Sequence, residues 1–248
     1  MMKWLHIMAS SAWFYRFSGQ AIPWLMSAFI VLLLIGLYGG LVTAPADYQQ
    51  GDAFRIIYIH VPAAWMSLFI YCVMAMYAVI ALVWRIKLAE VLLISSAPIG
   101  AAFTFLALVT GSLWGKPMWG TWWSWDARLT SELLLLFLYW GVMGLYAAIE
   151  DKRTASKAVS VLTLVGVVNI PIIHYSVSWW NTLHQGPSIT MTDKPTMPME
   201  MLMPLLVMAV AFKIFYGLSL LIRARAELVE REPQSRWLKA VIEENNDE

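Results

Sequence analysis

The stretch AIPWLMSAFIVLLLIGLYGGLV, from Ala21 to Val42, decides the fold class of this chain. It carries no charged residue, and it is long enough to cross about 30 Å of hydrocarbon, which takes roughly 20 apolar residues. The sequence Ala44-Pro45-Ala46 that follows resembles a signal-peptide cleavage site. The apolar run is, however, longer than the hydrophobic region of a signal peptide, which has roughly 7–15 residues. We therefore predict a retained transmembrane helix.

Five further apolar stretches predict an all-α, polytopic integral membrane protein with six transmembrane helices. They lie at 56–83, 91–113, 129–149, 158–178 and 199–222. Only 13% of the 248 residues are charged, whereas a soluble domain carries about 25%. The net charge of +1, without a basic stripe, argues against nucleic acid as a partner. We expect residues 1–222 to form one membrane domain and residues 223–248 a charged cytoplasmic tail.

Lysine and arginine residues are divided unevenly between the two sides of the predicted bundle. Twelve belong to the N-terminus, the second and fourth loops and the tail. The first, third and fifth loops, at about 43–55, 114–128 and 179–198, hold four: Arg55, Lys116, Arg128 and Lys194. Because cytoplasmic segments carry the excess of these residues, we predict cytoplasmic termini and an external face formed by these three loops.

Two histidines and a tryptophan-rich segment belong to the same three loops. His60 lies where the first loop enters the second span, the tryptophan segment forms the third loop, and His184 lies in the fifth. Loops one, three and five of a six-span protein share a side, whichever way the protein points. We therefore expect these three features to meet.

The third loop contains the segment WGKPMWGTWWSWD, from Trp114 to Asp126. Four residues are expected to break the preceding span and turn the backbone: Gly111, Gly115, Pro117 and Gly120. Positions 119, 122, 123 and 126 recur at i, i+3, i+4 and i+7, which predicts a short interfacial helix with an aromatic face.

An aromatic belt at the headgroup level is the alternative interpretation of this segment. Four of its indole rings present about 600–1,000 Å² of surface, at roughly 150–250 Å² each, and a patch of that size needs lipid or a large flat ligand. Belt tryptophans are shared between both interfaces, whereas this face also holds Trp65, Trp179 and Trp180, which makes eight of the fourteen. The asymmetry favours a flat ligand.

His60 and His184 are the candidate metal ligands. A lone interfacial histidine is usually solvated, but two beside an aromatic loop could bind the two axial positions of a haem iron, with the tryptophan loop covering the porphyrin plane. Arg55 and Arg128 are candidate partners for haem carboxylates, although Arg128 could equally pair with Asp126 or with lipid phosphate. Thioether attachment of haem is excluded, because the single cysteine, Cys72, belongs to no C-x-x-C-H motif.

Three ionisable residues fall inside the predicted spans. His174 is expected to hydrogen-bond to a neighbouring helix, and Glu132 to be either a buried acceptor or a support for a ligand residue. Lys213 either extends toward the interface or marks an inaccurate boundary.

The stretch Trp119-Gly120-Thr121-Trp122-Trp123-Ser124-Trp125-Asp126 resembles the W-G-x-x-W-x-W-D signature of the tryptophan-rich haem-handling proteins. The stretches APADY at 44–48, YIHVPAA at 58–64 and NTLHQG at 181–186 are similar to the branch named CcmC, the haem-handling protein C of bacterial cytochrome c maturation. The resemblance covers nearly the whole chain, from the first span to the sixth.

This resemblance implies a six-span inner-membrane protein that is not an enzyme and that binds haem b at the periplasmic face. It implies delivery of that haem to a periplasmic haem chaperone, and association with an ABC-type transporter (its ATPase and membrane subunits) and with a small single-span subunit. By position, His60 and His184 would be the axial ligands. The haem platform would consist of Trp114, Trp119, Trp122, Trp123, Trp125 and Asp126.

Two other functions stay open from the sequence. A b-type cytochrome that carries electrons would usually hold haem between histidines buried within spans, whereas His60 and His184 lie at span ends. A membrane subunit of a solute transporter would place ionisable groups or broken helices at the midplane, where these spans offer chiefly Lys213 and His174.

Overall fold

The computed structural model describes residues 10–184, 186 and 194–246. Over these ranges the regular structure is helical, and six segments are long and apolar enough to cross a membrane, which confirms the predicted six-span, all-α architecture. The elements are α2 (Ser11–Tyr38) continued by the π-helical η1 (Gly39–Thr43), the 3₁₀ turn η2 (Asp52–Ile56) leading into α3 (Ile57–Trp84), α4 (Lys87–Trp119), α5 (Ala127–Ala148), α6 (Lys152–Gly166), α7 (Asn169–Trp179), α8 (Met199–Arg231) and α9 (Arg236–Asn246).

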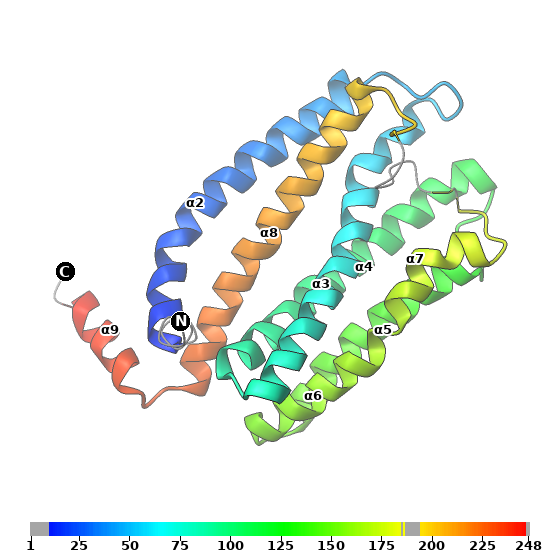
Figure 1. Cartoon of the computed structure of the whole chain (residues 1–248). Helices are drawn as coiled ribbons and strands as arrows, with labels where there is room; N and C mark the ends of the chain where they lie inside the picture. Colours follow the sequence, from blue (N-terminus) through cyan, green and yellow to red (C-terminus); the bar gives the residue numbers. More distant parts are fainter. Residues whose placement is uncertain (1–9, 185, 187–193, 247–248) are drawn as a thin grey trace.

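The helices pack as an elongated bundle with α3 and α4 at its centre (Figure 1). Helix α2 lies along α8 on one side, and α5, α6 and α7 cover the other. The core between them consists of fully buried side chains such as Ile70 and Met74 of α3 and Leu135 of α5. Alanines such as Ala63 and Ala97 are also fully buried, and small residues of this kind let membrane helices approach closely.

The fifth span is interrupted between α6 and α7 at residues 167 and 168. Asn169, at the start of α7, is buried and donates a hydrogen bond from Nδ2 to the Ser131 carbonyl of α5 at 2.9 Å. A side chain that bonds a neighbouring backbone in this way holds the two half-helices against α5, since polar groups in hydrocarbon must find partners within the protein.

The predicted short helix after the third span is wrong. Helix α4 continues through Gly111, Gly115 and Pro117 to Trp119, and the chain turns only at Gly120, whose φ of +75° suits glycine. The segment from 120 to 126 is not helical, because Ser112 and Thr121 side chains bond the carbonyls of Trp122 and Trp123, at 2.7 and 2.9 Å. The helix-like spacing of the aromatic residues is therefore divided between the end of α4 and an irregular loop.

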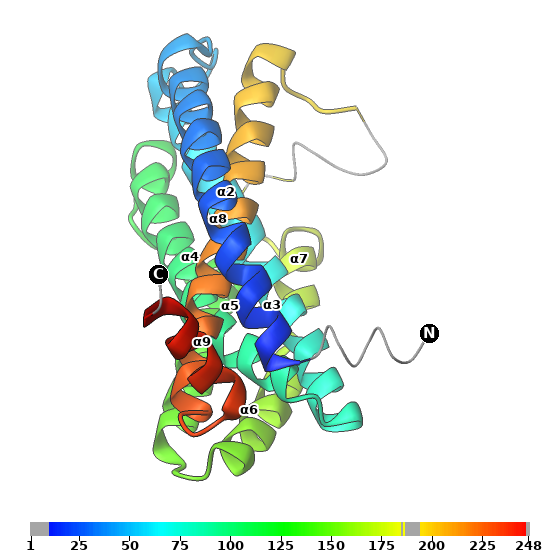
Figure 2. The same ribbon diagram turned by 90° about the vertical axis from the view of Figure 1, so that its left-hand side faces the viewer.

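Helix α8 extends nine residues beyond the predicted span end at 222, and the tail after it packs against the bundle. Helix α9 lies beside the start of α2 (Figure 2), where the rings of Trp237 and Tyr15 are 5.3 Å apart. Glu232 accepts hydrogen bonds from Ser11 and Trp237 and pairs with Lys87 at 2.9 Å. Burial alone would raise the pKa of Glu232, but these three partners outweigh it and lower the pKa below its ordinary value.

Candidate functional site

His60 is held in the first turn of α3 by a residue of α4. Its Nδ1 lies 3.0 Å from the hydroxyl of Thr110, which is buried. Gly111 provides the space for the ring, since a Cβ at this position would lie 2.9 Å from Cε1 of His60. Edge contact with Trp114, at 5.7 Å between ring centres and 79° between planes, completes this side of the site.

His184 reaches the same place from the segment that follows α7. Its backbone N–H donates to the hydroxyl oxygen of Thr182 at 3.0 Å, and that hydroxyl in turn donates to Oδ2 of Asp126. The other carboxylate oxygen of Asp126 accepts from the Leu129 N–H at 2.8 Å and so caps the start of α5. Asp126 therefore ties the segment that carries His184 to the beginning of α5.

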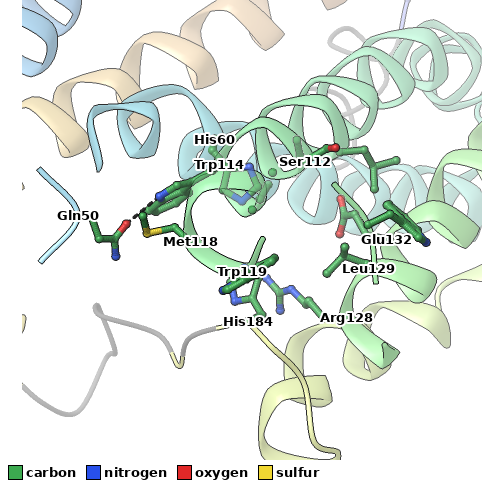
Figure 3. A pocket seen from close by; sticks show the side chains of 16 residues that line it. Gln50, His60, Ser112, Trp114, Met118, Trp119, Arg128, Leu129, Glu132 and His184 are labelled. Atoms are coloured by element: carbon green, nitrogen blue, oxygen red, sulfur yellow. Dashed lines mark hydrogen bonds between the residues drawn. The ribbon is translucent and has the colours of Figure 1, made fainter. Parts of the chain in front are cut away.

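The two histidine rings face each other with their centres 6.5 Å apart and their planes inclined by 35°. Residues from the first, third and fifth loops meet here, as the parity of the spans predicts. The rings line a cavity of about 80 Å³ (Figure 3) together with fourteen other residues, drawn from the segment before η2, α3, α4, the tryptophan loop and α5. The two histidines thus belong to one site.

Three of the five loop tryptophans line this cavity: Trp114, Trp119 and Trp123. Trp114 is fixed by a hydrogen bond from its Nε1 to Gln50, at 2.8 Å (Figure 3), and Trp119 lies 6.2 Å from His184 between ring centres. The Nε1–H of Trp123 is buried and has no hydrogen-bond partner in the described part of the chain. Trp123 therefore carries an unsatisfied donor in a side chain that lines the cavity.

Trp122 and Trp125 do not face the histidines. They are 53% and 77% exposed and line a separate apolar groove of about 600 Å³ between α4 and α5, which Trp123 and Trp140 also border. The five tryptophans that the resemblance assigns to one haem platform with Asp126 are thus divided between two surfaces, with Trp123 bordering both. Whether a tryptophan ring lines the histidine cavity or the groove depends on the direction of its side chain in the irregular loop, which the sequence spacing does not show.

The two arginines predicted near the site have different positions. Arg128 lines the cavity and donates from its guanidinium to the Ile173 carbonyl at 2.8 Å. Arg55 bonds the Gly40 carbonyl and pairs with Asp52 at 2.9 Å, and it is absent from the cavity wall. Asp126 caps α5 instead of pairing with Arg128, which leaves the remaining donors of Arg128 for another partner.

Glu132 and His174, whose roles the sequence left open, are also placed. Glu132 is buried, forms part of the cavity wall and accepts a hydrogen bond from Ser67 at 2.7 Å. His174 lies exposed on the outside of α7 with its ring against Tyr175. Among the described residues no hydrogen bond joins His174 to a neighbouring helix, so that expectation is wrong. Lys213 is exposed on α8, 5.9 Å from the ring centre of Phe69.

Sequence reasoning did not assign several residues of the site, among them Gln50, Thr110, Gly111 and Met118. A signal existed for one of them. Gly111 and Gly115 are one helical turn apart and both accommodate rings, of His60 and Trp119 respectively. Two glycines at i and i+4 lie on one face of a helix, where they can accommodate rings. From the sequence alone, the same two glycines could equally be helix breakers.

Comparison with known proteins matches residues 4–239 to the family model described as "Heme exporter protein C", CcmC. The chain belongs to this family. It is 51% identical to the protein named "Heme exporter protein C" of Haemophilus influenzae over 98% of this chain and 99% of that protein. The relative of the same name in Escherichia coli (strain K12) is also 51% identical, over 98% of both chains. A ccmC-like mitochondrial protein of cytochrome c biosynthesis from Marchantia polymorpha is 43% identical over 78% of this chain and 82% of its own.

Membership in the CcmC family makes the chain a multi-pass membrane protein of haem handling in cytochrome c maturation. The histidine pair and the three tryptophans of the cavity are, within the described residues, the groups of the site that suit an aromatic metal complex. Haem is here the cargo of the protein.

Proposed function

We propose that this CcmC-family protein binds haem b at the periplasmic face of the inner membrane, through His60 and His184 as axial ligands, and delivers it to a periplasmic haem chaperone. The observation that carries the proposal is the meeting of both imidazoles in one tryptophan-lined cavity. Two imidazoles that bind one metal ion from opposite sides, through bonds of about 2 Å, have ring centres about 6 Å apart. The observed separation is 6.5 Å.

The cavity walls also offer hydrogen-bond donors for the carboxylate groups of haem. Arg128 and the unpaired Nε1–H of Trp123 are two donors at the site. A buried donor without a partner costs about 1–3 kcal/mol, which a ligand carboxylate would offset. The wall offers Trp114 and Trp119 as apolar ring surfaces beside these donors.

The size of the cavity supports transient holding rather than enclosure. Organic ligands are usually enclosed in pockets of about 300–1,000 Å³, whereas this cavity measures about 80 Å³. The porphyrin therefore extends beyond it, which keeps one edge accessible to an acceptor. We infer that the chain holds and passes haem without catalysing a reaction, and that ligation is weak enough for release.

The sidedness and the partners belong to the same proposal. Twelve Lys and Arg on one side of the bundle against four on the other support a periplasmic site and cytoplasmic termini. A partner set of an ABC-type ATPase, its membrane subunits and a small single-span subunit accords with the name of the relatives, which describes haem export. A b-type electron carrier would retain its haem, so co-purification with the chaperone followed by assay of haem on each partner separates the two functions.

Replacing both His60 and His184 by alanine is expected to abolish the low-spin Soret and α bands of the detergent-purified protein, because both strong axial ligands are lost. The visible spectrum and the haem-to-protein ratio measure the effect. His174→Ala is the matched control, since this exposed ring lies on the outside of α7. An unchanged low-spin spectrum in the double variant would show that these histidines are not the ligands.

Asp126→Ala is expected to lower retained haem by roughly tenfold, the scale found when a group that supports a metal ligand is removed. The change removes the acceptor of Thr182 and frees the segment that carries His184. Loss of the helix cap itself costs only about 1 kcal/mol. Haem retained per protein after washing in detergent measures the result.

Asp151→Ala is the control for this prediction. Asp151 caps α6 with the same geometry, accepting from the N–H three residues later at 2.8 Å, but it lies in the connection between α5 and α6, away from the histidines. Equal haem content in the two variants would mean that Asp126 acts only as a cap.

A further inference from the structure

One turn of α4 determines which nitrogen of His60 faces the cavity. The hydroxyl of Thr110 donates to the Leu106 carbonyl of its own helix at 2.6 Å. A hydroxyl has a single hydrogen, so the 3.0 Å contact with His60 requires Nδ1–H to donate to the Thr110 oxygen. His60 is then the neutral tautomer whose Nε2 carries the lone pair, the form that binds a metal.

The neighbouring position keeps the ring against this acceptor. A Cβ at Gly111 would come within 2.9 Å of Cε1 of His60 and 3.5 Å of Nδ1. Any larger residue at 111 pushes the imidazole away from α4, and with it away from Thr110. The hydroxyl and the glycine next to it therefore act together on one ring.

We propose that Thr110 is a positioning residue that presents Nε2 of His60 to haem, an inference that rests on the proposed function. Metal-bound histidines usually donate to carboxylates or backbone carbonyls, which raise the basicity of the ring. The backbone carbonyl of Ala107 also interacts with the His60 ring. The Thr110 hydroxyl is the side-chain acceptor that holds Nδ1–H and so fixes the tautomer and the orientation of the ring.

Thr110→Val removes the side-chain acceptor of His60 and keeps the shape of the side chain. We expect retained haem to fall by roughly tenfold and the spectrum to shift toward the high-spin form, while Thr110→Ser restores both. Thr104→Val is the matched control, because buried Thr104 lies on the same helix and makes the same bond, to the carbonyl four residues earlier at 2.8 Å. It should leave haem content and spectrum unchanged.

The tautomer itself is measured without haem. In haem-free protein carrying ¹⁵N-histidine, we expect the His60 signal, assigned by its loss in His60→Ala, to show a single Nδ1–H form in the parent and in Thr110→Ser. Thr110→Val should give a mixture of tautomers. Gly111→Ala should produce the same mixture with the hydroxyl intact, whereas Gly144→Ala, where an added Cβ meets nothing within 4 Å, should not.

The two measurements separate the hypotheses. If the histidine double variant keeps its low-spin spectrum, ligation by His60 and His184 is wrong, and the presentation of Nε2 to haem by Thr110 is overturned with it. If ligation holds but Thr110→Val matches Thr104→Val in haem content and spectrum, or leaves a single Nδ1–H form, the role of Thr110 is wrong. Haem loss with a mixed tautomer, reversed by serine, supports it.

Discussion

Arg231→Met is expected to destabilise the folded protein by about 3–5 kcal/mol, the cost of breaking a buried ion pair by removing one partner. The Arg231 side chain is 4% exposed and pairs with Glu90 of α4 and Glu227 of α8, at 3.2 and 2.7 Å. It also donates to Tyr146 of α5 and Ser156 of α6. Methionine fills similar space but leaves both carboxylates without their cation. Thermal unfolding in detergent, followed by size exclusion, measures the loss.

Two further variants identify the cause of that loss. Arg153→Met removes an exposed arginine from α6, near the same end of the bundle, and should have little effect. Adding Glu90→Gln and Glu227→Gln to Arg231→Met should recover part of the stability, because neutral side chains no longer need the buried cation. If Arg231→Met unfolds at the same temperature as Arg153→Met, the ion-pair network contributes nothing measurable.

Gly100→Ala is the second large effect and should prevent close packing of α4 against α5. A Cβ at this position would lie 2.2 Å from the ring of Tyr139, whose side chain is fully buried and donates to the Ser67 carbonyl of α3 at 2.7 Å. Overpacking of a core costs about 1–3 kcal/mol, and displacing the tyrosine adds about 1–3 kcal/mol for its unpaired hydroxyl. Yield of monodisperse protein and its unfolding temperature report the effect.

Gly217→Ala provides the comparison, since an added Cβ there meets no atom within 4 Å. Alanine is favoured over glycine in a helix by about 1 kcal/mol, so this variant should be as stable as the parent or slightly more so. Equal unfolding temperatures for Gly100→Ala and Gly217→Ala would contradict the expected clash.

The helices and their order were predictable because membrane insertion depends on local sequence. Each predicted span corresponds to a helical segment long enough to cross the bilayer, the fifth being formed by α6 and α7 together. The boundaries were less accurate: the end of α4 was placed six residues early, at 113 instead of Trp119, and that of α8 nine residues early, at 222 instead of Arg231. Lys116, expected in the third loop, and Arg231, expected in the tail, therefore lie in the last turns of α4 and α8.

The sequence predicted the two histidines of the candidate site but not the residues that hold them in place. His60 and His184 could be brought together by parity alone, since an even number of spans places their loops on one side. Thr110 could not be distinguished from Thr104, because both threonines of α4 bond the carbonyl four residues earlier and only one of them lies opposite an imidazole. The sequence also did not show that Asp126, expected at the haem surface, anchors Thr182 and the start of α5.

The sequence by itself therefore determined the six spans, the common face of the three loops and the two histidines on it. These follow from transfer of contiguous apolar residues into the bilayer, which is a local property of the chain. Only the tertiary structure decided that Trp114, Trp119 and Trp123 line the histidine cavity while Trp122 and Trp125 face the groove between α4 and α5. Side-chain direction in an irregular loop depends on distant partners, here on the hydrogen bond from Ser112 to the Trp122 carbonyl across the turn at Gly120.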